Sequence, residues 1–144
     1  MGSMIGESDG RFQLSDGRSL GYCELGDPQG ELIFFVGGYP GSRWMAYLFA
    51  GSLRPGIRLV GIDRPGMYLS DFKPGWRMLD WLDDLVELAN HFQHDRFAIL
   101  GWSGGTPYMA ACAYKIPGYL SACGLLACMG PSEVSVKGAM LVPK

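Results

Sequence analysis

Stretches of consecutive apolar residues alternate with amphipathic stretches along most of this chain. The runs ELIFFV (31–36), IRLVGI (57–62) and FAIL (97–100) are almost entirely apolar, which is typical of strands buried on both faces of a sheet. Residues 76–92 instead repeat apolar side chains at spacings of three and four, the pattern of an amphipathic helix. Strands that alternate with helices in this way predict an α/β fold with a mostly parallel sheet.

The remaining elements follow from turn residues and shorter patterns. Asp16-Gly17 is a hairpin signal between two short strand candidates, and Ser42 is a suitable N-cap for a helix. The expected strands are 11–14, 19–26, 31–36, 57–62, 96–102 and 121–129, and the expected helices are 43–53, 76–92 and 105–114. Because no repeat, low-complexity tract or linker interrupts them, we expect one domain over residues 1–144.

Composition and charge argue against several classes of function. The chain has 144 residues and a net charge of −2. No cluster of Lys and Arg is dense enough to follow a phosphate backbone, so we do not expect nucleic acid as a partner. No run of 18 apolar residues is present, which argues against a membrane span. The first ten residues lack the basic and apolar regions of a secretory signal, and we therefore expect a cytoplasmic protein.

The spacing of the four cysteines does not indicate a disulfide framework or a zinc site. Cys23, Cys112, Cys123 and Cys128 lie in apolar segments and lack CxxC spacing. A disulfide framework or a zinc site would need closer pairs. We interpret all four as small buried hydrophobic residues in a reducing compartment, and we expect neither a metal nor a cofactor.

The segment Gly101-Trp102-Ser103-Gly104-Gly105 matches the pattern G-x-S-x-G. It lies directly between an expected strand and an expected helix, which is the position of a nucleophile elbow. At such an elbow the turn aims the serine hydroxyl away from the sheet, and the N–H of the next residue faces any oxyanion. Ser103 is therefore the candidate nucleophile and Gly104 an oxyanion donor. The alternative is a glycine-rich strand-to-helix turn without chemistry.

Three segments together resemble one known family. FFVGGYPGSR, GIDRPGM and LGWSGGTPY occur in this order and at these separations in the α/β-hydrolase superfamily. The sequence is most similar to the branch of epoxide hydrolases, haloalkane dehalogenases and small esterases. The resemblance extends from the strand near Phe12 to Pro131. It implies that the loop after the 31–36 strand gives a second oxyanion N–H, at the position of Tyr39.

Two positions depart from the pattern of that family. The His of the family's His-Gly-x-Pro loop is replaced here by Gly37, which removes a side chain that usually braces the loop. A small residue that follows Asp-Arg-Pro-Gly-x in the family is replaced by Tyr68. Neither change removes a catalytic atom, but both alter the expected shape of the pocket.

A dinucleotide-binding fold is the rival interpretation of the same loop. A glycine-rich turn follows a strand, and Asp63 ends the next strand at about the distance of a ribose-binding acid. However, residues 37–42 do not spell G-x-G-x-x-G, and Pro40 lacks the N–H that should face phosphate. The elbow at Ser103 would also have no explanation. Asp63 is better interpreted as a structural residue that hydrogen-bonds its own turn.

A serine nucleophile needs a base and an orienting acid, which follow the serine along the chain in this superfamily. No His follows Ser103. The two that exist, His91 and His94, end the helix before the elbow strand. We expect them to be solvated and to lie at the edge of the sheet opposite the elbow. Glu133 follows the last expected strand and is a candidate acid, although a surface loop glutamate is the simpler interpretation.

The chain resembles the first six strands of an eight-strand fold and reaches residue 144 where relatives enter their lid. We therefore expect an incomplete α/β-hydrolase fold whose strand 121–129 forms an apolar edge. Such edges recruit partners, so we expect self-association or a second chain there. The first functional hypothesis is a serine hydrolase acting on a small ester or related acyl substrate. The second is a truncated, non-catalytic half that serves as a binding or regulatory module.

Overall fold

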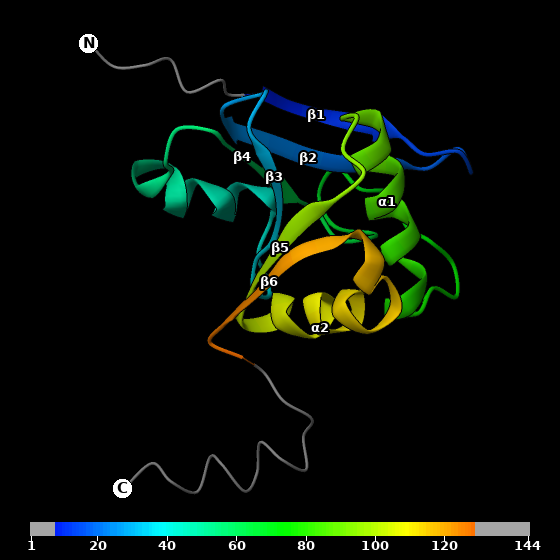
Figure 1. Cartoon of the computed structure of the whole chain (residues 1–144). Coiled ribbons are helices and arrows are strands. Elements are labelled where there is room, and N and C mark those ends of the chain that lie inside the picture. The colour runs from blue at the N-terminus through cyan, green and yellow to red at the C-terminus, as the bar shows by residue number, and fades with distance from the viewer. Residues whose placement is uncertain (1–7, 129–144) are drawn as a thin grey trace, which may run out of the picture.

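A computed structural model of the protein describes residues 8–128. Its centre is a single six-stranded sheet in the order β1-β2-β4-β3-β5-β6 (Figure 1). The strands are β1 Ser8–Gln13, β2 Ser19–Gly26, β3 Glu31–Val36, β4 Ile57–Ile62, β5 Phe97–Trp102 and β6 Leu120–Leu126. The two N-terminal strands pair antiparallel with each other, and β2 pairs antiparallel with β4. The other four strands are parallel, so the predicted α/β class with a mostly parallel sheet is confirmed.

One of the two central strands of the sheet is β3, which pairs with β4 on one side and with β5 on the other. Its burial is nearly complete after the first residue, because ELIFFV supplies apolar side chains to both faces. The carboxyl ends of β4, β3 and β5 are therefore adjacent. The loops that follow these three strands meet at one edge of the sheet.

Helices cover both faces of the sheet (Figure 1). On one face, α1 Leu82–His91 and α2 Thr106–Lys115 pack on a core that contains Phe34, Val60 and Phe97. On the other face, the 3₁₀ helix η1 Arg43–Ser52 buries Ala46 against a smaller core. Three further 3₁₀ turns are η2 Met78–Asp80, η3 Ser103–Gly105 and η4 Pro117–Tyr119.

The helix predicted over 76–92 is shorter in the structure. The Asp80 carboxylate accepts a hydrogen bond of 2.9 Å from the backbone N–H of Arg77, and this closes the separate turn η2 before α1 begins. The expected helix at 43–53 is present as a 3₁₀ helix. Its N-cap is Ser42, as predicted, with the side chain accepting a hydrogen bond from the N–H of Trp44.

The interpretation of all four cysteines as buried is wrong for two of them. Cys23 and Cys112 are buried, but Cys123 and Cys128 are exposed. Cys123 lies in β6, which is at the end of the sheet and pairs only with β5 among the described strands, and Cys128 lies just after that strand. Five of its seven residues are exposed, including Leu125 and Leu126.

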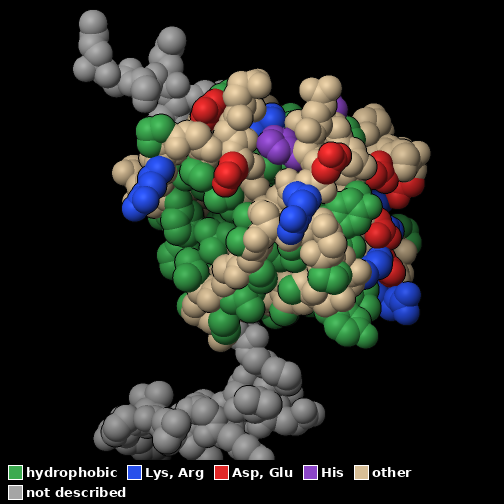
Figure 2. Space-filling model, in the orientation of Figure 1, with side chains coloured by type: hydrophobic (Ala, Val, Ile, Leu, Met, Phe, Trp, Pro, Cys, Tyr) green, Lys and Arg blue, Asp and Glu red, His purple; other side chains and the backbone are tan. Residues whose placement is uncertain are grey.

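The sheet face beside β6 is hollow, with an apolar floor and with Glu31, Arg96 and Ser121 also in its lining. A cavity of about 450 Å³ crosses β3, β5 and β6, and its floor includes Ile33, Ala98 and Ala122, which are partners in register. Figure 2 shows hydrophobic side chains gathered on this side of the molecule, between η1 and β6. Within residues 8–128, no helix is long and apolar enough to cross a membrane.

Candidate functional site

Ser103 lies at the carboxyl end of β5 and immediately before α2. Its φ is 50°, in the left-handed region that residues with a Cβ rarely adopt. The turn is tight because Gly105 lies against the backbone of β3, where an added Cβ would overlap the carbonyl of Val36. The Thr106 hydroxyl also donates a hydrogen bond of 2.7 Å to the carbonyl oxygen of Ser103. The local geometry is therefore that of a sharp elbow with a half-buried serine at its tip.

The loop that follows β3 lies directly beside this elbow. A Cβ added to Gly38 would lie 3.3 Å from Ser103 Cβ and 3.7 Å from Ser103 Oγ. A Cβ added to Gly104 would lie 3.1 Å from the backbone nitrogen of Tyr39. The structure thus brings Ser103, Gly104 and Tyr39 together, although they come from segments about 60 residues apart.

Arg64, which follows β4, braces this loop, and the sequence analysis missed it. Its side chain is 7% exposed, and Nη2 donates hydrogen bonds to the carbonyl oxygens of Gly38 at 3.0 Å and Gly41 at 3.5 Å. Its guanidinium lies 5.8 Å from the ring centre of Tyr39 and 5.6 Å from that of Tyr108, within the range of a cation–π contact. The sequence alone gave no local signal for this role, because it depends on the pairing of β4 with β3.

The structure shows what surrounds the two residues that depart from the family pattern, Gly37 and Tyr68. The space beside Gly37 is filled by Met45, whose Cβ would lie 3.1 Å from a Cβ added to the glycine. Tyr68 has a φ of 47° and donates a hydrogen bond of 3.0 Å from its hydroxyl to the carbonyl oxygen of Pro40. Arg64, Met45 and Tyr68 therefore support the loop in the absence of a histidine.

Asp63 is part of a buried charge network beneath this edge. It is 1% exposed, accepts hydrogen bonds from the Arg43 guanidinium at 2.8 Å and the Arg43 N–H at 2.7 Å, and accepts a third from Leu69 N–H at 3.2 Å. Arg43 also pairs with Asp9, and this hydrogen bond lowers the pKa of Asp9. Asp63 thus holds its own turn and the start of η1, and its oxygens are not directed to a ribose.

Three aromatic side chains project near the elbow edge. Tyr39, Trp44 and Tyr68 are 79%, 57% and 61% exposed. They give a partly apolar rim to the loops around Ser103. Among the described residues, no three His, Cys, Asp or Glu side chains are grouped so that they could hold a metal ion.

The two histidines lie away from Ser103. His91 ends α1 and packs against Phe12, with 4.8 Å between the ring centres and the rings tilted by 35°. His94 is half-buried and lines a pocket with Pro28 and Arg58, at the edge where the parallel strands begin. Glu133 lies outside the described residues.

The chain matches a protein-family model and several solved structures. The family model described as "alpha/beta hydrolase fold" matches residues 31–143, which is more than half of the chain. The search of curated proteins gave no match.

Several solved structures share the fold. A hydrolase from Pseudomonas aeruginosa is 22% identical with a TM-score of 0.74, over 94% of this chain and 54% of that one. A loop variant of the haloalkane dehalogenase DbeA from Bradyrhizobium elkanii is 20% identical with a TM-score of 0.72, over 87% and 42%. The epoxide hydrolase CorEH is 16% identical with a TM-score of 0.75, over 91% and 49%. The chain therefore spans about half the length of the proteins it matches.

Proposed function

This chain belongs to the alpha/beta hydrolase fold family, and from that premise we propose that it supplies the nucleophile half of a serine hydrolase. Its substrate is a small ester or a related acyl compound. Ser103 is the nucleophile, and the backbone N–H groups of Gly104 and Tyr39 form the oxyanion hole.

One observation carries this proposal: the left-handed Ser103 stands beside two backbone segments that can donate to the same oxyanion. Backbone strain of this kind is retained where the surrounding structure fixes it, as at nucleophile elbows. A Cβ at position 104 would lie only 3.1 Å from the Tyr39 nitrogen, so this close approach favours a glycine there. Arg64 supports the arrangement because it binds the Gly38 carbonyl, one residue before the Tyr39 N–H.

The proposed reaction follows from these positions. Ser103 Oγ attacks the acyl carbon while a base takes the hydroxyl proton, and the carbonyl electron pair moves onto oxygen. The N–H groups of Gly104 and Tyr39 stabilise this oxyanion. When the tetrahedral intermediate collapses, the bond to the leaving alkoxide breaks, and the protonated base returns its proton to that group. Water then hydrolyses the acyl-serine by the same steps.

The base does not come from either histidine of this chain, because both lie at the opposite edge of the sheet. We propose that a His reaches the site from a second polypeptide or from residues outside this sequence. Glu133 is the candidate within the chain for the acid that orients it.

Labelling of the serine with a fluorophosphonate probe tests the proposal. Intact-mass spectrometry of the 144-residue chain, with imidazole added to supply the base that the chain itself lacks, should show one adduct, and the Ser103→Ala variant should show none under the same conditions. Ser52→Ala is the matched control, because Ser52 is an exposed serine at the end of η1, and its adduct should be unchanged.

The outcome separates the two candidate functions. An adduct that depends on Ser103 means that the serine is activated and that the next search is for the source of the base. Absence of an adduct in a folded sample contradicts the hydrolase proposal. It favours the alternative of a non-catalytic half that binds another molecule through the same loops.

We further propose that the free edge of β6 pairs with a second copy of this chain. Its exposed Leu125 and Leu126 at the carboxyl end, and the cavity that Ala122 lines at its start, support this, since unprotected edges of this kind recruit strands. Sedimentation at micromolar concentration should give a dimer or larger species. Leu126→Lys should shift it toward monomer, whereas Tyr114→Lys, on the exposed side of α2, should not. A monodisperse wild-type monomer would contradict this proposal.

A further inference from the structure

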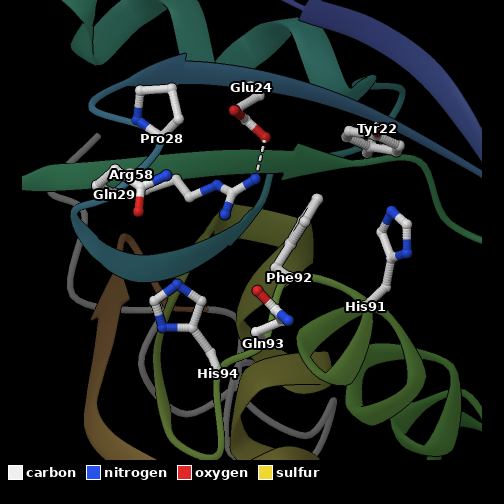
Figure 3. Close-up of a pocket in the computed structure, with 9 residues that line it drawn as sticks. All are labelled: Tyr22, Glu24, Pro28, Gln29, Arg58, His91, Phe92, Gln93 and His94. Carbon is white, nitrogen blue, oxygen red and sulfur yellow. Dashed lines mark hydrogen bonds and ion pairs between the residues drawn. The ribbon is translucent and has the colours of Figure 1, made fainter.

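A second pocket lies at the end of the parallel strands opposite Ser103. Its volume is about 510 Å³, and Figure 3 shows that side chains reach it from separate segments of the fold. Glu24 comes from β2, Arg58 from the start of β4, and Phe92, Gln93 and His94 from the segment that ends α1. None of these residues belongs to the proposed hydrolase site.

Arg58 is held rigidly at the centre of this pocket. Its Nη2 donates a hydrogen bond of 2.7 Å to Glu24, and its guanidinium lies 3.9 Å from the ring centre of Phe92. The orientation of the guanidinium is therefore fixed on two sides. Within residues 8–128, Glu24 is the only hydrogen-bond partner of this side chain, and Nε is buried without any. Nε is enclosed by protein, so the donors left for a ligand are the remaining Nη N–H groups, and a guanidinium fixed in this way is pre-organised for an oxyanion.

Gln93 and His94 complete the arrangement at the end of α1. The N–H groups of Gln93 and His94 bind the carbonyl oxygens of Asn90 and Ala89, both at 2.9 Å, which is a Schellman motif. The C′ residue of this motif is usually glycine, yet Gln93 occupies it with a φ of 62°. The Gln93 amide and the His94 imidazole both project toward Arg58 (Figure 3), so the strained position is used to bring a side chain to the pocket.

We propose that this pocket binds the anionic group, a carboxylate or a phosphate, of a small molecule. The Glu24 charge is already paired with Arg58, whereas the free guanidinium N–H groups, the His94 imidazole and the Gln93 amide supply donors. The negative end of the α1 dipole opposes an anion, but the Schellman hydrogen bonds occupy two of the terminal carbonyls. The volume of the pocket matches that of small-ligand sites.

A titration followed by NMR tests this inference. The ¹⁵N-labelled chain is titrated with sodium phosphate, with sodium succinate, and with sodium chloride at matched ionic strength. We expect saturable shifts of the Arg58 Nε–H and the Gln93 side-chain amide with at least one of the two oxyanions, and no saturation with chloride. Phosphate and succinate distinguish the two possible anionic groups.

Gln93→Gly separates binding from folding. It removes a pocket donor and relieves the left-handed backbone, so it should raise the Tm while weakening oxyanion binding several-fold. The double variant Glu24→Met, Arg58→Met removes the buried pair together and should lower affinity at least about tenfold. Arg11→Met removes an exposed arginine outside the pocket and should bind like the wild type.

Two results would overturn the inference. One is a response to phosphate and succinate that is no more saturable than the response to chloride. The other is saturable binding whose affinity is equal in the wild type, Gln93→Gly and the folded double variant, since the anion would then bind elsewhere.

Discussion

Arg64 donates a hydrogen bond of 3.0 Å to the carbonyl oxygen of Gly38, so the residue that follows β4 supports the loop that follows β3. Because β3 and β4 are neighbours in the sheet, Arg64 reaches the loop directly, without a long intervening segment. It fixes the loop from the side opposite the elbow.

Removal of this brace should destabilise the fold and loosen the loop. Arg64→Met removes one donor from the Gly38 carbonyl oxygen, which still accepts a hydrogen bond from the Gly41 N–H, and the side-chain donor of the Gly41 carbonyl oxygen. The free energy of unfolding should therefore fall by about 1–3 kcal/mol. Hydrogen exchange at the Tyr39 N–H should become faster. Denaturant unfolding and amide exchange check both effects. Arg77→Met is the control, because its side chain is 82% exposed and should change stability by less than about 0.5 kcal/mol. Equal effects of the two substitutions would show that Arg64 does not brace the loop.

A methyl group at position 105 should destabilise the fold at the elbow. A Cβ there would overlap the carbonyl of Val36 in β3, a central strand that cannot move without breaking its hydrogen bonds. Gly105→Ala should therefore lower stability by about 2–3 kcal/mol, as measured by chemical denaturation. Gly118→Ala meets no atom within 4 Å and should be nearly neutral. A tolerated Gly105→Ala would mean that the elbow packs more loosely than described.

The backbone strain at Ser103 can be measured by comparing the stabilities of two variants. Glycine adopts a φ of 50° without steric cost, whereas alanine does not. Ser103→Gly should therefore be more stable than Ser103→Ala by about 1 kcal/mol, a difference that thermal unfolding can resolve. Equal melting temperatures would contradict a left-handed serine at this position.

The four cysteines should fall into two classes by their reactivity with alkylating reagents. Burial raises the pKa of Cys23 to about 11 and that of Cys112 to about 12, so both remain protonated thiols at pH 8. Native protein treated with iodoacetamide should gain two labels, on Cys123 and Cys128, and denatured protein should gain four. Burial also raises the pKa of Cys123, which should slow its reaction. Four labels on the native chain at one rate would contradict this assignment.

The sequence predicted the sheet well because its signals there are strong. Apolar runs such as ELIFFV leave few alternatives to a buried strand, and glycines mark the turn at Ser103. The helices were predicted less accurately, because the interaction of Asp80 with Arg77 divides a continuous apolar pattern into a 3₁₀ turn and α1. Apolar periodicity does not register such a side-chain contact.

The support of the candidate site was harder to predict than its central residues. Ser103 and Tyr39 lie in recognisable motifs, but the role of Arg64 depends on which strand lies beside β3. The exposure of Cys123 and Cys128 likewise depends on the position of β6 at the end of the sheet. These properties belong to the tertiary arrangement, which the local pattern of residues does not encode.

The central position of β3 has a consequence for the timing of assembly. The loops that meet around Ser103 follow β3, β4 and β5, so the chain from Glu31 to Tyr108 contains all of them. The chain is synthesised from its N-terminus, and folding generally proceeds in the same order. These segments are therefore all present before β6. We therefore expect the edge that carries Ser103 to assemble first, so that later strands, or another chain, are added to it.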